Sequence, residues 1–369
     1  MMEYKKGLEG IIAAETQIGL VNGTLGHLIY RGHWAKELAL SYSFEEVAYF
    51  IWNGAFPTEA ELVTFKEQMT SYRELPSYIK TILDTLPNEM DVMSTMRTAI
   101  SALGTPAFAW PPTIDQAMHV TALLPSIIAY KYQKNQGADF IEPNPELDHV
   151  ANYIYMIKGQ LPSDVEIKAL TAYLILTIEH GMNASTFASR VVVSTESEII
   201  SGVCAAIGSM KGPLHGGAPS EVIEMINEIG TIDNIEPWIR NKLEKGEKLM
   251  GFGHRVYKTR DPRSEALKVV SKDLAQESDW FNLITQMEQT AIDLLEEYKP
   301  GRKLYTNVEF FAAAVLKGLD IPKELFTPTF TSSRIIGWTA HILEQSQDNR
   351  IFRPQSSYTG QMPEQAAKF

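Results

Sequence analysis

Signals that start an α-helix recur along most of this 369-residue chain, and they restrict the folds that it can adopt. Ser163 and Glu166 have the spacing of a capping box, in which each side chain accepts a hydrogen bond from the other residue's backbone N–H. Ile167, Leu170 and Leu174 then follow at helical spacing. We therefore predict a largely helical protein. Comparable start signals or helical periods occur at Ser43 with Glu46, at Thr195 with Glu198, and over 220–228, 262–276, 279–298 and 308–319.

The first thirty residues follow a different pattern. Asn22 and Gly23 lie between QIGLV and TLGHLIY, and this dipeptide favours a hairpin turn because both residues tolerate a left-handed backbone. Strand and helix patterns do not alternate in the way that builds a doubly wound sheet. The sequence thus predicts an all-α fold with a small N-terminal β-hairpin.

The balance of charge argues against several classes of protein. The net charge of −12 is unlike the basic surface of a protein that binds nucleic acid or an anionic membrane. Cys204 is the single cysteine, so we expect no internal disulfide and no Cys/His metal site, and a cytoplasmic location fits best. The N-terminus lacks the apolar core of a signal peptide, and no apolar run is long enough to span a membrane. An anionic ligand would therefore need a local basic cluster.

Three histidines lie in glycine-rich segments beside predicted helix ends. His180 is in IEHGMNAST, His215 in KGPLHGGAP and His254 in MGFGHRVYKTRDPR. Glycine lets the backbone approach a ligand closely, and the N-terminus of a following helix offers free N–H groups. A histidine in such a loop can donate a hydrogen bond to a carbonyl oxygen that gains negative charge. Taken singly, each histidine is equally well explained as a capping or packing residue.

A basic cluster accompanies the third histidine. Asp261 is placed as the N-cap of the next helix, which puts Arg263 in the first turn, where its charge opposes the helix dipole. This placement makes sense if Arg263 binds a carboxylate, which a guanidinium does through two parallel hydrogen bonds. Such a basic run is also common as an ordinary solvated surface. The other members of the cluster are Arg255, Lys258 and Arg260.

Two more arginines and one acid complete the candidates. Arg334 lies among apolar and small residues in FTSSRIIGW, and a buried arginine needs an anionic partner, either an acidic side chain or a ligand. Arg353 follows in IFRPQSSYTG. Glu309 lies in the first turn of an apolar helix that Asn307 can cap. The helix dipole alone favours an acid there, but the apolar neighbours can also raise its pKa into the range of a general base.

These segments together resemble the citrate synthase family. The matching pieces run in family order from about residue 7 to residue 360: GLEGIIAAET, LIYRGH, GPLHGGAPSEV, GFGHRVYKTRDPR, TNVEFF, FTSSRIIGW and RPQSSYTG. The resemblance implies a large helical domain formed by 1–217 and 323–369, a small helical domain formed by 218–322, and an active-site cleft between them. It also implies a homodimer in which Arg353 reaches the partner's site, and a small domain that closes to exclude water.

The resemblance implies a role for each candidate. The reaction would join the methyl carbon of acetyl-CoA to the keto carbon of oxaloacetate and hydrolyse citryl-CoA. It would need no cofactor, because the CoA thioester is a substrate. His215 would stabilise the enolate, His254 would polarise the keto group and Glu309 would remove the methyl proton. Oxaloacetate and citrate would be bound by His180, Arg263, Phe330, Arg334 and Arg353, and the phosphates of CoA by Arg255, Lys258 and Arg260.

Glu309 departs from the family pattern, which has aspartate at this place. The added methylene puts the rate and the preferred acyl-CoA in question, because a misplacement of about 1 Å can cost about a hundredfold in rate. A 2-methylcitrate synthase, which uses propionyl-CoA, would share these motifs, since one methyl group in a pocket is worth only about 1–3 kcal/mol. A third interpretation is a non-catalytic paralogue that binds oxaloacetate or CoA.

Overall fold

The computed structural model describes residues 4–216, 218–254, 256–275 and 279–362, and it confirms the prediction of a helical fold. Within these residues the chain forms sixteen α-helices, four short 3-10 helices and one small sheet. The α-helices are α1 (Ala35–Ser41), α2 (Phe44–Asn53), α3 (Glu59–Ser71), α4 (Ser77–Thr85), α5 (Val92–Ser101), α6 (Ile114–Asn135), α7 (His149–Lys158), α8 (Asp164–Thr177), α9 (Ala184–Val193), α10 (Ile199–Met210), α11 (Ala218–Ile229), α12 (Ile235–Glu244), α13 (Pro262–Ala275), α14 (Asp279–Tyr298), α15 (Val308–Gly318) and α16 (Phe326–Gln347). The 3-10 helices are η1 (Lys6–Leu8), η2 (Pro106–Phe108), η3 (Ile232–Asn234) and η4 (Lys323–Leu325).

The N-terminal sheet is antiparallel and has one strand more than the sequence predicts. The strand β1 (Gly19–Asn22) pairs with β2 (His27–Tyr30), as the hairpin signal indicates, and β2 also pairs with β3 (His33–Trp34). The Asn22 side-chain oxygen accepts hydrogen bonds from two backbone N–H groups of the turn, at 3.1 and 3.0 Å, and so stabilises it. β3 has only two residues, too few for a period-two pattern to mark it in the sequence.

Most of the predicted helix starts are confirmed. Both serine capping boxes form, ahead of α2 and α8. The start predicted at Thr195 with Glu198 is wrong, because the Thr195 hydroxyl donates to the Val192 carbonyl in the preceding turn. The helix α10 begins after Glu198 without a side-chain cap. A threonine hydroxyl bonds backward to a carbonyl as readily as it caps a following helix, and the sequence pattern does not distinguish the two.

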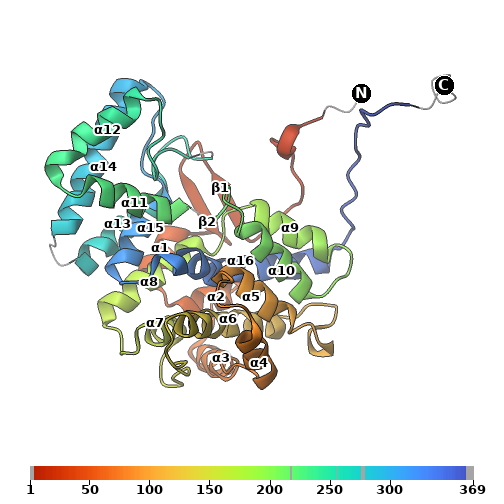
Figure 1. Cartoon of the computed structure of the whole chain (residues 1–369). Helices are drawn as coiled ribbons and strands as arrows, with labels where there is room; N and C mark the ends of the chain where they lie inside the picture. The colour runs from red at the N-terminus through yellow and green to blue at the C-terminus, as the bar shows by residue number, and fades with distance from the viewer. Residues whose placement is uncertain (1–3, 217, 255, 276–278, 363–369) are drawn as a thin grey trace.

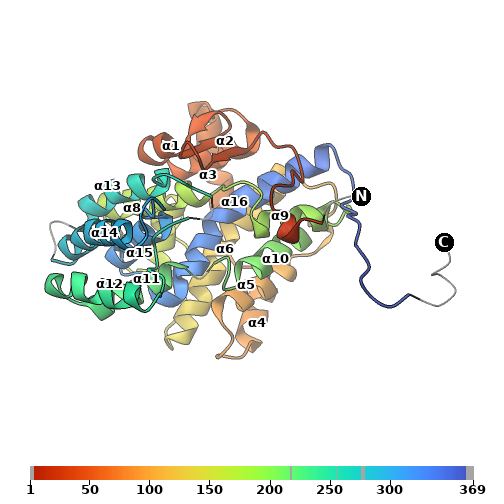
Figure 2. The ribbon, with the colours of Figure 1, turned by 90° about the horizontal axis from the view of Figure 1, so that it is seen from above.

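The helix α16 crosses the middle of the molecule in both ribbon views (Figures 1 and 2). It packs against α6, α8 and α9, and its side chains are buried along most of its length. The buried set includes polar residues such as Ser333, Arg334 and His341. Because buried polar groups need hydrogen-bond partners, α16 carries a polar network through the core as well as apolar packing.

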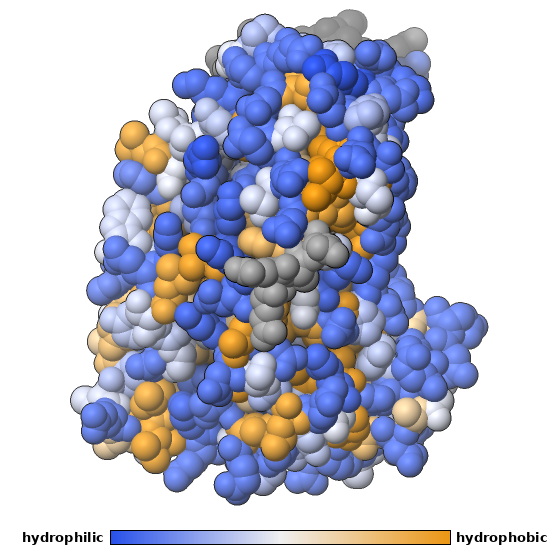
Figure 3. Space-filling view, turned by 90° about the vertical axis from the view of Figure 1, so that its left-hand side faces the viewer, coloured by the Kyte–Doolittle hydropathy of each residue, from blue (hydrophilic) through white to orange (hydrophobic). Residues whose placement is uncertain are grey.

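The helices α11 to α15 gather on one side of the molecule (Figure 1). Within this group α13 packs on α15, and it also packs on α8 and α1 in the rest of the molecule. An exposed ion pair, Lys168 with Asp273 at 3.6 Å, joins α8 to α13. The outer face of the group is mostly hydrophilic, with small and separate apolar patches (Figure 3).

The turn of the hairpin touches the loop that precedes α13. The backbone N–H of Lys258 donates to the Gly23 carbonyl at 2.8 Å. A Cβ at Gly23 would lie 2.0 Å from the carbonyl oxygen of Val256, and one at Gly26 would lie 2.8 Å from Cγ2 of Thr259. Glycine is therefore required for this approach, and the turn braces the loop that carries His254.

Both ends of the chain leave the body on the same side (Figures 1 and 2). Phe352 attaches the C-terminal segment to α9, because its N–H donates to Ser194 Oγ at 3.1 Å and its ring meets the edge of Phe187. Beyond it the described residues are exposed, including the apolar Tyr358 and Met362. Among the helices of the described residues, none is long and apolar enough to cross a membrane.

Candidate active site

Separate elements bring the predicted polar residues together. His180 follows α8, Arg263 lies in the first turn of α13, Glu309 in the first turn of α15, and Arg334 within α16. The rings of His180 and His254 meet at 5.5 Å between centroids. Arg263 and Arg334 both act electrostatically on the pKa of Glu309. Residues that are far apart in the sequence therefore form one charged cluster.

His254 has a defined tautomer. The N–H groups of Val256 and Tyr257 donate to Nδ1 at 2.9 and 3.1 Å, so the hydrogen of the neutral ring lies on Nε2. Burial, helped by the charge of Arg263, lowers the pKa of His254 to about 4, and the ring is neutral at pH 7. Nε2 lies 3.4 Å from Nη2 of Arg263. Both atoms carry hydrogens, so they are two neighbouring donors suited to an oxygen that carries or gains negative charge.

Arg263 is buried in an ion pair and is only 3% exposed. Its Nε and Nη2 bond the two carboxylate oxygens of Asp261 at 3.0 and 2.8 Å. Asp261 also accepts the backbone N–H groups of Arg263 and Val308, so it caps α13 as predicted and ties it to α15. The sequence predicted that Arg263 binds the carboxylate of a ligand, and in the structure Asp261 already provides one carboxylate partner. A guanidinium has five N–H donors, and the bonds to Asp261 use two of them, which leaves capacity for a second anion.

Glu309 supplies the carboxyl group of this cluster. Asn307 caps α15 as predicted, because its side-chain oxygen accepts the N–H of Glu309 at 3.0 Å. Burial raises the pKa of Glu309 to about 7, against the opposite effect of Arg263 and Arg334. A carboxyl group with a pKa near 7 can both accept and return a proton at neutral pH.

His215 is held by residues that the sequence did not single out. Its Nε2 lies 2.8 Å from the hydroxyl of Ser185 and 3.4 Å from the backbone N–H of the same residue. The Ser185 hydroxyl in turn accepts the indole N–H of Trp338 at 2.9 Å and lies 2.8 Å from Oδ1 of Asn183. Because the backbone N–H can only donate, Nε2 is the acceptor and the ring hydrogen lies on Nδ1. Burial lowers the pKa of His215 to about 4, so this ring is also neutral.

Arg334 is anchored deep in the core and is 2% exposed. Its Nε donates to the Thr177 carbonyl at 2.5 Å, and its guanidinium lies 4.7 Å from the centre of the Phe330 ring. Burial lowers the pKa of Arg334, and the negative charge of Glu179 opposes this effect. A buried arginine was expected to have an anionic partner. Glu179, which the sequence analysis did not single out, provides a negative charge that acts on Arg334.

His180 has a buried ring nitrogen beside the cluster. Among the residues that the structure describes, its Nε2 finds no hydrogen-bond partner. Burial, with the charges of Arg263 and Arg334, holds the pKa of His180 well below its usual range. A buried polar atom without a partner costs roughly 1–3 kcal/mol, so its presence beside two arginines points to a polar ligand.

Lys258, Arg260 and Arg353 lie outside the cluster. Lys258 and Arg260 are exposed at its edge, and Arg260 pairs with Glu265 at 3.2 Å. Arg255 lies outside the described residues. Arg353 is exposed on the C-terminal segment, which leaves the body of the chain (Figure 1), so one chain alone does not bring it to the other candidates.

The chemistry that the cluster offers is that of acids, bases and fixed hydrogen-bond donors. It combines a carboxyl group of pKa about 7, two neutral histidines with defined tautomers, and two buried guanidinium groups. In the part of the chain that the structure describes, no group of three His, Cys, Asp or Glu side chains could hold a metal ion. Such a set suits proton abstraction from a carbon acid and the binding of a polyanionic carbonyl compound.

Comparison with known proteins agrees with this chemistry. The model of the family described as "Citrate synthase, C-terminal domain" matches residues 7–355. Citrate synthase 2 of Bacillus subtilis is 40% identical, over 97% of this chain and 96% of its own, and 2-methylcitrate synthase of Mycobacterium tuberculosis is 38% identical, over 97% and 91%. A solved ternary complex of citrate synthase from Thermoplasma acidophilum with carboxymethyl coenzyme A and oxaloacetate has a TM-score of 0.90 at 30% identity, and the match covers 98% of each chain. The chain therefore belongs to the citrate synthase family.

Proposed function

We propose that the protein is a citrate synthase, which condenses acetyl-CoA with oxaloacetate and hydrolyses citryl-CoA to citrate and CoA. The observation that carries the proposal is the place of Glu309 in one cluster with two buried arginines, Arg263 and Arg334, which act on a carboxyl group whose pKa burial raises to about 7. A thioester methyl group is a weak acid, so its deprotonation needs a placed base and a hydrogen bond to the enolate. The relative from Thermoplasma acidophilum, which holds oxaloacetate and a CoA derivative, supports the substrate class.

In this proposal the cluster first binds oxaloacetate. Arg263 and Arg334 supply two positive charges for its two carboxylates, and Phe330 packs against the second guanidinium. His180 uses its buried Nε2, which has no partner among the described residues, to bond the bound acid. The Nε2–H of His254 donates a hydrogen bond to the keto oxygen. This bond polarises the carbonyl group and makes its carbon more electrophilic.

The carbon–carbon bond then forms between the two substrates. Glu309 takes a proton from the methyl group of acetyl-CoA, and His215 donates its Nδ1–H to the enolate oxygen. The methyl carbon attacks the keto carbon, and His254 acts as the acid toward the oxygen that becomes the hydroxyl of citryl-CoA. Water then cleaves the thioester and releases CoA. Ser185 keeps the His215 ring in the tautomer that this step needs.

A 2-methylcitrate synthase, which would use propionyl-CoA, is the second candidate. One observation favours it: relatives with the two names are almost equally similar to the chain, at 40% and 38% identity. Compared with the aspartate that the family has at this place, Glu309 has one more methylene, which moves the carboxylate relative to the acyl group. One methyl group in a pocket changes the affinity for an acyl-CoA by only about 1–3 kcal/mol, so the two substrates are hard to separate by binding. The ratio of kcat/KM for the two acyl-CoA substrates separates these activities.

We further propose that the active unit is a homodimer in which Arg353 completes the partner's site. The exposed C-terminal segment with its apolar Tyr358 and Met362 supports this, because a second chain would cover these side chains. Lys258 and Arg260, together with Arg255, would bind the phosphates of CoA. The small domain would be 218–322 and the large domain 1–217 with 323–369. A cytoplasmic location and a reaction without a cofactor are part of the same proposal.

Release of free thiol tests this function. The protein is mixed with oxaloacetate and either acetyl-CoA or propionyl-CoA, with each acyl-CoA alone as the control for simple hydrolysis. Oxaloacetate-dependent release with acetyl-CoA is the expected result, and faster release with propionyl-CoA would assign the 2-methylcitrate activity instead. Oxaloacetate binding without release from either thioester would replace both with a non-catalytic binding protein.

A further inference from the structure

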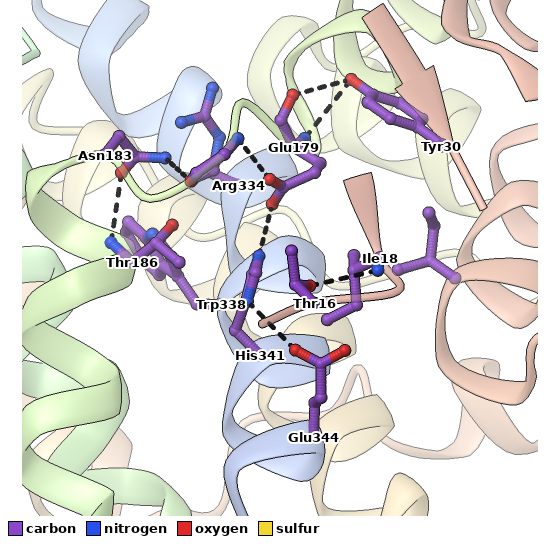
Figure 4. A network of polar contacts seen from close by, with 12 residues as sticks. Thr16, Ile18, Tyr30, Glu179, Asn183, Thr186, Arg334, Trp338, His341 and Glu344 are labelled. Atoms are coloured by element: carbon purple, nitrogen blue, oxygen red, sulfur yellow. Dashed lines mark hydrogen bonds and ion pairs between the residues drawn. The ribbon is translucent and has the colours of Figure 1, made fainter. Parts of the chain in front are cut away.

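A largely buried series of polar side chains lies behind His180 and has no part in the proposed chemistry. It runs from Glu344 through Arg190 and His341 to Glu179, the residue before His180. Figure 4 shows three of its members, Glu344, His341 and Glu179. Glu179 and His341 are fully buried, and Arg190 is 4% exposed. Buried charges are costly unless they are paired, so this series calls for a role that its position can explain.

Arg190 fixes the direction of the hydrogen bonds in the series, because its guanidinium can only donate. Nη1 of Arg190 lies 2.9 Å from Nδ1 of His341 and 2.7 Å from a carboxylate oxygen of Glu344. A guanidinium only donates, so Nδ1 of His341 accepts and the hydrogen of the neutral ring lies on Nε2. That Nε2–H is directed at Oε2 of Glu179, 3.1 Å away. Arg190 thus sets the tautomer, and His341 holds the carboxylate.

Glu179 in turn holds the loop that carries His180. Its second carboxylate oxygen accepts the backbone N–H of Gly181 in a short hydrogen bond. Its main-chain carbonyl accepts the hydroxyl of Tyr30 at 3.0 Å (Figure 4). The chain is therefore held on both sides of His180, before it through the backbone of Glu179 and after it through Gly181. The carboxylate of Glu179 also acts electrostatically on Arg334.

Glycines on two other elements lie directly against the side chain of Glu179. A Cβ at Gly19 of β1 would lie 2.7 Å from Cγ of Glu179. A Cβ at Gly337 of α16 would lie 3.1 Å from its Oε2 and 2.2 Å from the Ile178 carbonyl oxygen. Glycines on β1 and α16 thus allow both elements to pack closely against Glu179, and this close packing supports the position of its carboxylate.

We propose that Glu179 and His341 are positioning residues for the keto-acid substrate. His341 orients the carboxylate of Glu179, and Glu179 fixes the loop of His180 while it balances the charge of Arg334. Neither side chain touches a reacting atom. The inference rests on the proposed function, because it takes oxaloacetate as the ligand of His180 and Arg334.

Two substitutions of His341 separate positioning from packing. In His341→Asn the amide reaches the place of Nδ1 and can accept from Arg190, but it cannot reach Glu179. In His341→Gln the amide reaches the place of Nε2 and can donate to Glu179. We expect His341→Asn to weaken oxaloacetate binding by about tenfold or more, the effect of losing a hydrogen bond to a charged group. The Gln variant should bind within about threefold of the unchanged protein on the same scale.

The readouts are the dissociation constant of oxaloacetate by calorimetry and the KM values of both substrates. The KM of acetyl-CoA should change by less than about twofold. The reason is that Glu179 acts on His180 and Arg334, which are proposed to bind oxaloacetate and not the acyl-CoA. Equal effects of the two variants, or unchanged oxaloacetate binding in His341→Asn, would overturn the proposal. If thermal unfolding shows that His341→Asn is not folded, Glu179→Gln replaces it, with about tenfold weaker binding expected and unchanged binding as the contradiction.

Calorimetry also keeps this test separate from the proposed function. If the protein binds oxaloacetate but releases no thiol, the proposed condensation reaction is refuted. The oxaloacetate affinities of His341→Asn and His341→Gln can still be compared in that case. A protein that does not bind oxaloacetate at all would overturn both proposals.

Discussion

The dependence of activity on pH follows directly from the surroundings of Glu309. Burial raises its pKa to about 7, and a base that removes the methyl proton is active only when it is ionised. Roughly one tenth of the carboxyl group is ionised at pH 6 and roughly nine tenths at pH 8, for a pKa of about 7. We therefore expect the rate to rise roughly tenfold between these values and to level off above pH 8.

The two catalytic histidines do not disturb this range. The pKa values of His215 and His254 are both lowered to about 4, so neither ring changes its charge between pH 6 and pH 8. The rise should therefore fit a single ionisation.

The assay is the initial rate of thiol release with both substrates well below their KM values, so that the profile reports groups of the free enzyme. Circular dichroism at each pH controls for unfolding. A rate that is constant or falls from pH 6 to pH 8 would refute the assignment of Glu309 as the base.

Three further predictions concern neighbouring contacts. Gly23→Ala places a carbon 2.0 Å from the Val256 carbonyl, so we expect a loss of about 1–3 kcal/mol in unfolding free energy, measured by urea denaturation, with a raised KM for acetyl-CoA. Glu309→Gln should be more stable than the parent at pH 8 by about 1–3 kcal/mol, because the folded pKa lies above the unfolded value and ionisation opposes folding as pH rises from about 4.5 to 7; the difference in thermal midpoint should shrink by pH 5. Ser185→Ala removes the hydroxyl beside Nε2 of His215, so kcat should fall by about tenfold or more while the calorimetric affinity for oxaloacetate stays the same. The first prediction is contradicted if Gly23→Ala leaves the unfolding free energy unchanged, and the second if Glu309→Gln is stabilised equally at pH 8 and pH 5. An unchanged kcat in Ser185→Ala would contradict the third.

Local chemistry explains which features of the fold were predictable. The capping boxes ahead of α2 and α8 lie within four residues of sequence and form in the structure as predicted. Asp261 and Asn307 cap their helices for the same reason, and they fix the places of Arg263 and Glu309. The Thr195 start failed because one hydroxyl has two local partners within reach, and only the folded chain decides between them.

The supporting residues of the site were not predictable, because tertiary packing creates their roles. Ser185, Glu179 and His341 lie in or beside ordinary helical patterns, and their partners come from elements far away in the sequence. A capping interpretation of Asp261 was possible, but its bidentate bond to Arg263 requires the geometry of the folded loop. His341 in particular lies among the buried residues of α16, and the sequence gives no sign of its hydrogen-bond partners Arg190 and Glu179.

The most direct test of the account is the turnover of Glu309→Gln. This variant keeps the shape of the side chain and removes the base, and general base catalysis is worth about 10²–10⁴ in rate. We predict that oxaloacetate-dependent thiol release falls by about that factor while oxaloacetate still binds with nearly its original affinity. Turnover close to that of the unchanged protein would contradict the central claim that Glu309 is the base of the condensation.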